Sequence, residues 1–134
     1  TTITTHKEDS MQVSIEKPNL SSDTQTVDVQ VEDWDTWNVD ITLSHIIAPL
    51  LRKYKERNNG YPSTLDKEKW DNMLDSMIYS FEFKIANTDV LDVCLDSCVN
   101  NHSSDECKEC MENTQAKVSQ GFLLFGMYFE HLWT

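Results

Sequence analysis

Four cysteines are the residues whose types and spacing indicate chemistry most directly. They form two pairs, Cys94 with Cys98 and Cys107 with Cys110, separated by eight residues. Residues three or four positions apart share one face of a helix, so the four sulfurs can converge across a helical hairpin. Four thiolates suit a structural zinc site, which leaves no open coordination position for a substrate.

The same spacing suits two other states of the cysteines. Two disulfides, Cys94–Cys110 and Cys98–Cys107, would staple the hairpin. Four reduced and buried thiols are the third alternative. Because the redox poise of the cytosol disfavours disulfides, structural zinc is the leading prediction.

Carboxylates on the two predicted central helices could also carry chemistry. Asp71, Asp75 and Glu82 lie within about 40° of one another around a helix axis, and Asp40 belongs to the preceding helix. Carboxylates that project between the helices of a bundle can bind Mg²⁺ or Mn²⁺. The alternative interpretation is that Asp40 caps its helix and the others are solvated.

Aromatic and basic residues near these carboxylates could form a ligand pocket. Tryptophans usually pack in the core, but a π-lined pocket beside basic side chains could hold a nucleotide-like ligand. The chain has only three glycines, no Gly-rich phosphate loop and no Ser-His-Asp motif, so we assign no catalytic residue. The candidate ligand-binding residues are Trp37, Asp40, Arg52, Lys55, Trp70, Asp75 and Glu82.

The apolar pattern predicts an α+β fold that is mostly α. Apolar residues alternate with polar ones near both ends of residues 11–32, which predicts a β-hairpin with one buried face on each strand. Apolar residues at helical spacing then predict helices from a cap at Asn38 or Asp40 to a turn at 58–62, from Ser63 to Ile85, and from Ser103 toward Trp133. Ser63 and Ser103 are the predicted N-caps.

These elements predict one domain over residues 1–134. It comprises a flexible segment at 1–10, the hairpin packed on an antiparallel bundle of three to four helices at 38–134, and a cysteine-containing hairpin at 90–110. A two-stranded hairpin is marginal alone, so it must lie on the helices or pair with another chain. Gly121 and Gly126 are unfavourable inside a helix, which predicts that another backbone, the hairpin or the first helix, approaches both.

The charge of the chain restricts the class of partner. With 23 acidic and 11 basic residues, the net charge is −12, which argues against general binding of nucleic acid or of anionic membranes. No apolar run approaches the length of a membrane span or a signal-peptide core, so the expected location is the cytoplasm of the host cell.

Two parts of the chain resemble a family of small proteins of tailed bacteriophages. The matching segments read DTWNVDITLSHIIAPLLRKYKERNNGYP with KWDNMLDSMIYSFE, and QGFLLFGMYFEHLW near the end. The resemblance implies a phage origin, a host-cell setting and a β-then-helical layout, and it carries over no catalytic residue. The positions that match the family pattern and are candidates for its function are Asp35, Trp37, Asp40, Gly60, Pro62, Trp70, Asp75 and Glu82.

The leading functional hypothesis is a non-catalytic phage accessory protein that binds a host protein or a small signalling nucleotide, with a role against host defence. A first alternative is a divalent-metal-dependent all-α nucleotide hydrolase that uses Asp40, Asp71, Asp75 and Glu82. A second alternative is a virion or assembly component, a homo-oligomer in which the hairpins of different chains pair.

Overall fold

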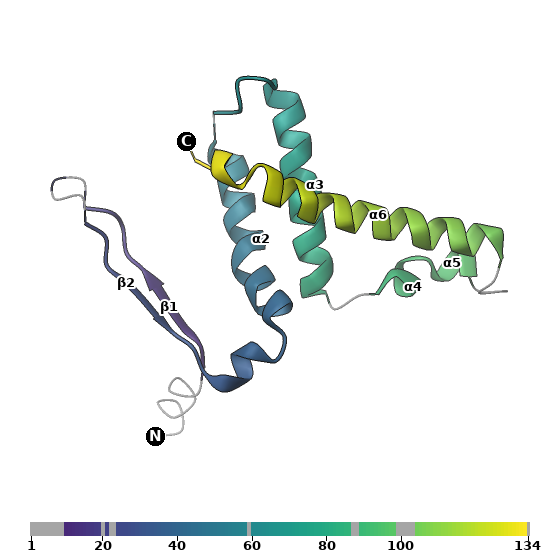
Figure 1. The fold of residues 1–134 in the computed structure, drawn as a ribbon, viewed down its shortest axis with the longest axis horizontal. Helices are drawn as coiled ribbons and strands as arrows, with labels where there is room; N and C mark the ends of the chain where they lie inside the picture. Colours follow the sequence, from purple (N-terminus) through teal and green to yellow (C-terminus); the bar gives the residue numbers. More distant parts are fainter. Residues whose placement is uncertain are drawn as a thin grey trace. The chain divides into compact units, whose positions relative to one another are not determined.

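The computed structural model of the protein describes residues 10–19, 21, 24–58, 60–86, 89–98 and 104–133. The fold is α+β and mostly α, as predicted, with an N-terminal antiparallel hairpin followed by helices that pack together (Figure 1). The chain divides into two compact units, Thr1–Val39 and Asp40–Thr134. Residues 1–9, nearly all of the segment predicted to be flexible, lie outside the described residues.

The first unit contains the predicted hairpin. Strands β1 (Gln12–Ile15) and β2 (Val27–Gln30) pair antiparallel, with Val13 opposite Val29 and Ile15 opposite Val27. A 3₁₀ helix, η1 (Asp33–Thr36), follows. All strand residues are exposed, so the hairpin prediction is confirmed but the predicted burial of one strand face is not observed.

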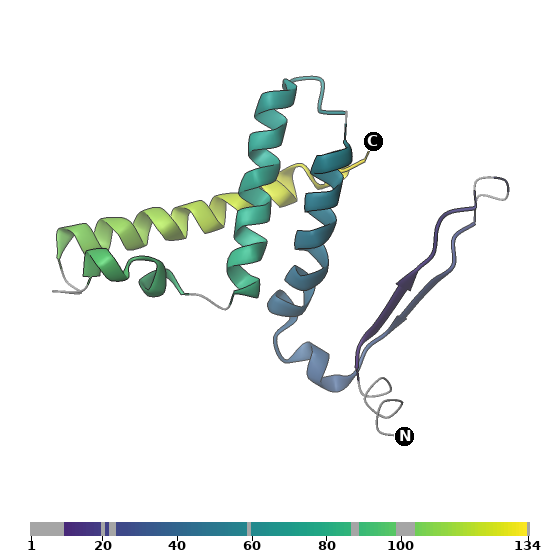
Figure 2. The same cartoon turned by 180° about the vertical axis from the view of Figure 1, so that it is seen from behind.

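The second unit is helical. The helices α2 and α3 lie side by side in both views and are joined by ion pairs (Figures 1 and 2). The helix α6 packs across α3. Ion pairs show that α2 and α3 are antiparallel, because Asp40 near the start of α2 pairs with Lys84 near the end of α3. The elements are α2 (Val39–Arg57), α3 (Lys67–Ile85), α4 (Val90–Val93), α5 (Leu95–Cys98), α6 (Asp105–Met127) and the 3₁₀ helix η2 (Phe129–His131).

Side-chain caps fix the beginnings of α3 and α6. The Asp66 carboxylate accepts a hydrogen bond from the backbone N–H of Lys69 (2.8 Å), so the cap of α3 lies three residues after the predicted cap Ser63. The Ser104 hydroxyl accepts from the backbone N–H of Cys107 (3.1 Å) and caps α6. The predicted cap Ser103 lies outside the described residues.

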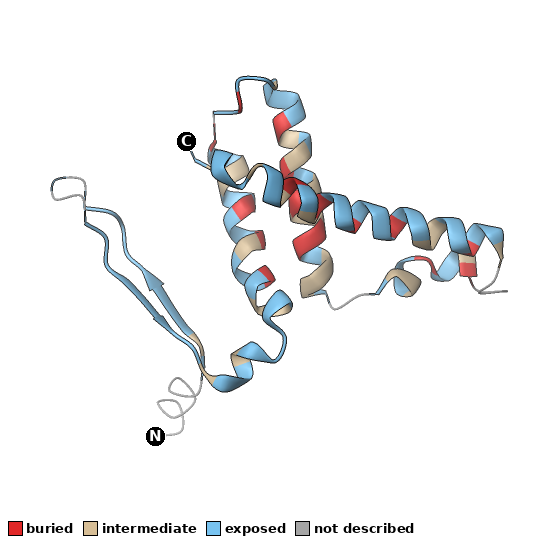
Figure 3. Ribbon diagram, in the orientation of Figure 1, coloured by how far each residue is buried: buried red, intermediate tan, exposed pale blue. Residues whose placement is uncertain are grey.

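The core of the second unit lies where α2 and α6 meet α3 (Figure 3). The Phe81 ring packs edge-to-face against Phe122 and Phe125, with centroids 5.1 and 4.9 Å apart. These contacts hold α6 on α3. The buried core residues are Ala48, Leu51, Trp70, Leu74, Met77, Phe81 and Leu124.

Gly121 allows α6 to approach α3 closely. A Cβ built on Gly121 would lie 2.2 Å from the Ser76 carbonyl oxygen and 1.9 Å from Ser80 Oγ. The Ser80 hydroxyl donates across the crossing to the carbonyl of Val118 (2.6 Å). The predicted close approach at Gly121 is therefore confirmed, with α3 as the neighbour rather than the hairpin or the first helix. A Cβ on Gly126 would meet no atom within 4 Å, so the same prediction is wrong there.

The cysteines form two disulfides, and the predicted structural zinc is wrong. Cys94 is bonded to Cys110, and Cys98 to Cys107. The bonds join the segment of α4 and α5 to the first turns of α6, in the pairing that the spacing allows. Because all four sulfurs are bonded, none remains as a thiolate ligand, and no three His, Cys, Asp or Glu side chains among the described residues are placed to hold a metal.

Candidate functional site

The residues that the sequence groups into one ligand pocket differ in burial and belong to both units. Trp37 belongs to the first unit and is exposed, whereas Trp70 is fully buried in the core of the second. Because Trp70 is fully buried in the core, its ring is not available to line an open pocket in the second unit. Arg52 and Lys55 do lie beside Asp75 and Glu82, at the junction of α2 and α3.

Three ion pairs cross between α2 and α3 and form a charged seam. Asp40 pairs with Lys84 (2.9 Å), Arg52 with Glu82, and Lys55 with Asp75 (2.7 Å). Each acidic residue on one helix thus meets a basic residue on the other. The charged seam is defined by Asp40, Arg52, Lys55, Asp75, Glu82 and Lys84.

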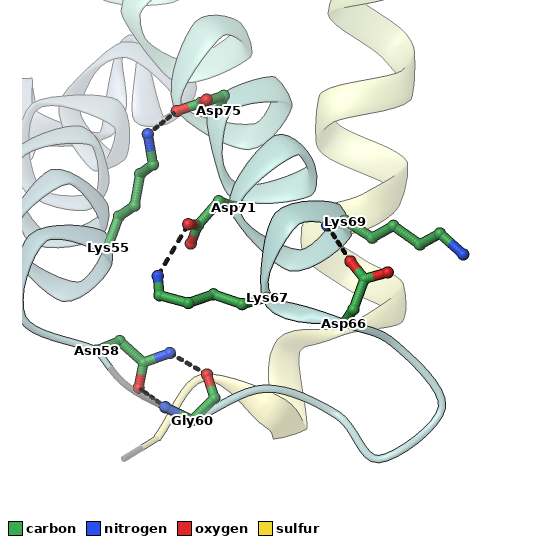
Figure 4. A network of polar contacts seen from close by, with 8 residues as sticks. All are labelled: Lys55, Asn58, Gly60, Asp66, Lys67, Lys69, Asp71 and Asp75. Carbon is green, nitrogen blue, oxygen red and sulfur yellow. Dashed lines mark hydrogen bonds and ion pairs between the residues drawn. The ribbon is translucent and has the colours of Figure 1, made fainter.

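Figure 4 shows how the carboxylates at one end of the seam are engaged. The Lys55 ammonium reaches from α2 to Asp75, and the Lys67 ammonium binds Asp71 within α3 (2.9 Å). Asp71 and Asp75 therefore bind different cations. This arrangement gives no support to the shared metal site that the nucleotide-hydrolase alternative requires.

Ion pairing shifts the pKa of two residues of the seam, Asp40 and Lys55. A hydrogen bond from the Lys84 ammonium lowers the pKa of Asp40 below its ordinary value of 3.8. The hydrogen bond to the Asp75 carboxylate raises the pKa of Lys55. Both shifts favour the charged forms of these two side chains.

We expect Lys84→Met to raise the pKa of Asp40 toward 3.8. The lowered pKa in the folded protein means that the Asp40 ion pair favours folding above the ordinary pKa, and that this contribution is lost as the pH falls through the lowered value. Carboxyl ¹³C NMR titration measures the shift directly. Lys53→Met is the control, because Lys53 pairs with Glu56 instead. An unchanged Asp40 titration in Lys84→Met would contradict the assignment.

A cleft of about 390 Å³ opens on the seam, lined by Arg52, Lys55, Glu56, Asp75 and Ile78. Its two cations already bind carboxylates, and its lining contains as many acidic as basic residues. A phosphate group would therefore have to displace a carboxylate in order to bind. The seam is better suited to hold α2 on α3 than to bind an anionic nucleotide.

A second opening, which we call the apolar groove, lies between α2 and the end of α6. Its volume is about 550 Å³. Leu50 on one side is 64% exposed, and Phe129 on the other is 61% exposed. Single exposed apolar side chains are common on protein surfaces, but a contiguous apolar patch around one opening marks a binding site or an aggregation-prone surface. The lining residues are Ile47, Leu50, Leu51, Tyr54, Phe125, Phe129 and Leu132.

Tyr54 and aromatic packing fix the walls of the apolar groove. The Tyr54 hydroxyl donates toward the carbonyl oxygens of His131 (3.3 Å) and Trp133 (3.1 Å), which attaches the C-terminal segment to α2. Burial raises the pKa of Tyr54, so it remains a neutral donor. The Phe125 and Phe129 rings pack edge-to-face, with centroids 5.6 Å apart. The groove is therefore built before any ligand binds.

The apolar groove was not predicted from the sequence, because its residues belong to helix stripes that were expected to face a core. The apolar stripe on α2 is wider than the surface that contact with one neighbouring helix can bury. Of its residues, Leu51 is buried against α3, whereas Leu50 projects away from it. The signal in the sequence was the apolar arc of α2, which is too wide to be covered by one neighbouring helix.

Comparison of the chain with protein-family models, curated proteins and solved structures gives no match. Within the part of the chain that the structure describes, no helix has the length and apolar character needed to cross a membrane.

Proposed function

We propose that this chain is a non-catalytic accessory protein that binds a partner protein through the apolar groove. The observation that carries the proposal is an open, preformed groove lined by aliphatic and aromatic side chains from two packed segments. The occupant that fits best is a basic amphipathic helix of the partner.

The chemistry of the groove favours a helix over an extended strand. The wall residues on α2 and α6 belong to helices, whose backbone groups are bonded internally, so this surface offers no open sheet edge for a strand. A helix satisfies its own backbone and needs only apolar side chains at i, i+3, i+4 and i+7 to fill such a groove. Its apolar stripe would contact Leu50 and Phe129.

The charge of the second unit favours a basic partner. Residues 40–134 contain 15 acidic and 9 basic side chains, which gives this unit a net negative charge. Complementary charge around an apolar contact speeds association and selects against acidic partners. The phage resemblance supports a host protein as the source of this helix. A role against host defence would follow from the capture of that helix in the groove.

The test uses the full, oxidised chain and a fluorescent helical peptide of about 18 residues, five helical turns of Leu and Lys with one apolar face. A permuted peptide of the same composition has no such face and controls for charge alone. We expect the amphipathic peptide to bind more tightly than the permuted one in fluorescence anisotropy. Equal binding of both peptides would overturn the proposal.

Two leucine substitutions, one inside the groove and one outside it, test where the peptide binds. Leu50→Ser should weaken amphipathic-peptide binding about tenfold, which corresponds to about 1.4 kcal/mol. Leu123→Ser changes a leucine that is exposed on α6 but does not line the groove, so binding should be unchanged. Both sites are on the surface, where substitutions cost little stability. Wild-type affinity in Leu50→Ser would place binding elsewhere.

A further inference from the structure

The two disulfides of the second unit differ in how far their cysteines are buried. Cys98 and Cys107, which form one bond, are both 0% exposed. In the other bond, Cys94 is 1% exposed, whereas the second unit leaves Cys110 on α6 partly exposed. A thiolate must reach one of the two sulfurs in order to break a disulfide. Cys110 is therefore the cysteine at which a thiol in solution can begin the reaction.

The buried end of the Cys94–Cys110 bond has a hydrogen-bond donor beside it. The Thr114 hydroxyl lies 3.5 Å from Cys94 Sγ, and Thr114 is itself buried. Because a disulfide sulfur carries no proton, the hydroxyl is the donor. A thiolate released at Cys94 would be buried, which is costly without a polar partner. Thr114 supplies that partner, and a better stabilised thiolate leaves faster.

The Cys98–Cys107 bond has a different environment. Cys107 Sγ lies 3.8 Å from Met111 Sδ, a thioether that has no proton to donate. A thiolate released at Cys107 would therefore gain no hydrogen bond from this neighbour. Since both cysteines are also fully buried, the second unit protects this bond from the first attack.

We propose that Cys110 is a thiol-exchange site, at which a small thiol opens the Cys94–Cys110 bond before the Cys98–Cys107 bond. The attacking thiolate forms a bond to Cys110 Sγ, the bond between Cys110 and Cys94 breaks, and its electron pair passes to Cys94 Sγ. The products are a mixed disulfide on Cys110 and a thiolate on Cys94, which accepts a hydrogen bond from Thr114. The segment of α4 then loses its covalent link to α6, while α5 keeps one.

The charge around Cys110 selects the class of thiol. Residues 89–98 and 104–112 contain seven acidic side chains and one basic side chain, and exposed Glu106 lies one helical turn before Cys110. An aminothiol attacks as a thiolate whose charge its own ammonium group balances. A thiol with a carboxylate attacks with two negative charges, which these acidic residues repel. The site therefore favours small aminothiols.

The first test treats the full oxidised chain briefly with cysteamine and stops the reaction with acid. The cysteines are then alkylated in denaturant and mapped by mass spectrometry. We expect cysteamine on Cys110 and an alkylated Cys94, with the Cys98–Cys107 bond intact. Cysteamine on any other cysteine first, or opening of Cys98–Cys107 as early as Cys94–Cys110, would overturn the proposal. Survival of both bonds until urea unfolds the chain would overturn it as well.

Substitution of Thr114 tests the hydrogen bond to the leaving sulfur. Thr114→Val keeps the shape of the side chain and removes the hydroxyl, so the Cys94–Cys110 bond should open about tenfold more slowly. Thr114→Ser keeps the hydroxyl and should retain most of the wild-type rate. A variant that merely loosens the fold would open both disulfides faster, which is the opposite sign. A wild-type or faster rate in Thr114→Val would contradict the role of Thr114.

The selection by charge is tested with 3-mercaptopropionate in place of cysteamine. Raising the salt from about 0.02 to 0.5 M should accelerate its reaction at Cys110 severalfold, because salt screens the repulsion from the acidic residues. The reaction of cysteamine should change little over the same range. An equal response of both thiols to salt would contradict the preference for aminothiols.

Discussion

Gly121→Ala is expected to destabilise the second unit by about 3 kcal/mol or more, one of the two largest effects that the structure predicts for a small change. The added methyl group would lie 2.2 Å from the Ser76 carbonyl oxygen. That oxygen belongs to the backbone of α3 and cannot rotate away, so α3 and α6 must separate. Separation would also stretch the hydrogen bond from Ser80 to Val118.

Gly126→Ala is the control for Gly121→Ala. It makes the same chemical change five residues later on the same helix, at an exposed position with no atom within 4 Å of the new Cβ. Alanine is favoured over glycine in a helix by about 1 kcal/mol, so this variant should be as stable as the wild type or slightly more stable.

Urea unfolding of the two oxidised variants measures the difference in free energy. The structure predicts that Gly121→Ala lies about 3–5 kcal/mol below Gly126→Ala. Similar unfolding free energies for the two variants would show that α6 does not cross α3 at Gly121. Because this crossing positions Phe125 at the apolar groove, the groove would then be placed in doubt as well.

Reduction of the disulfides is expected to release α4 and α5 while leaving the core of the second unit folded. Each of these helices has only four residues, which is too short to be stable alone. Their buried cluster consists of Cys94, Cys98 and Cys107, with Leu91, Cys110 and Met111 packed around it. Removal of a native disulfide costs about 2–5 kcal/mol, so the loss of both exceeds what this small cluster can replace.

Hydrogen exchange with and without a strong reductant tests this prediction. Amides of residues 90–98 should lose their protection on reduction, whereas those of Leu74 and Met77 in α3 should keep theirs. A metal chelator is the control and should change neither region, because the sulfurs bind each other and not zinc. Release of residues 90–98 by the chelator, or continued protection after reduction, would contradict the disulfide pairing.

The disulfides also bear on where the protein acts. Disulfides persist in oxidising compartments and are rare in the cytosol, where thiol systems reduce them. The host-cytoplasm location expected from the sequence stays a prediction. If it holds, the working form of the chain has residues 90–98 released, and the groove between α2 and α6 is the part of the second unit that persists.

Sequence periodicity was sufficient for the elements of this fold but not for the contacts between them. The two-residue alternation around Val29 indicates a strand with one apolar face. The helical spacing around Leu74 indicates a helix with one apolar face. They do not report which neighbour covers that side. The residues of β1 and β2 are exposed, for example, although their alternation is typical of half-buried strands.

The candidate site depended on contacts of this kind. The pairing of Lys55 with Asp75 follows from the offset between α2 and α3, and the groove beside Leu50 follows from where α6 crosses. The local sequence encodes neither the offset between α2 and α3 nor the position at which α6 crosses. The cysteine spacing gave the correct disulfide partners, but zinc and disulfides need the same convergence of sulfurs, and the choice between them rested on an assumed compartment.

The most direct test of the proposed function is ¹H–¹⁵N and methyl NMR mapping of the full oxidised chain with the basic amphipathic peptide. We predict shift changes centred on Leu50, Phe125, Phe129 and Leu132, with the charged seam and the hairpin unaffected. Changes centred on Arg52, Lys55 and Asp75 instead would contradict the account, because the acidic chain would then be attracting the peptide by charge and not through an apolar groove.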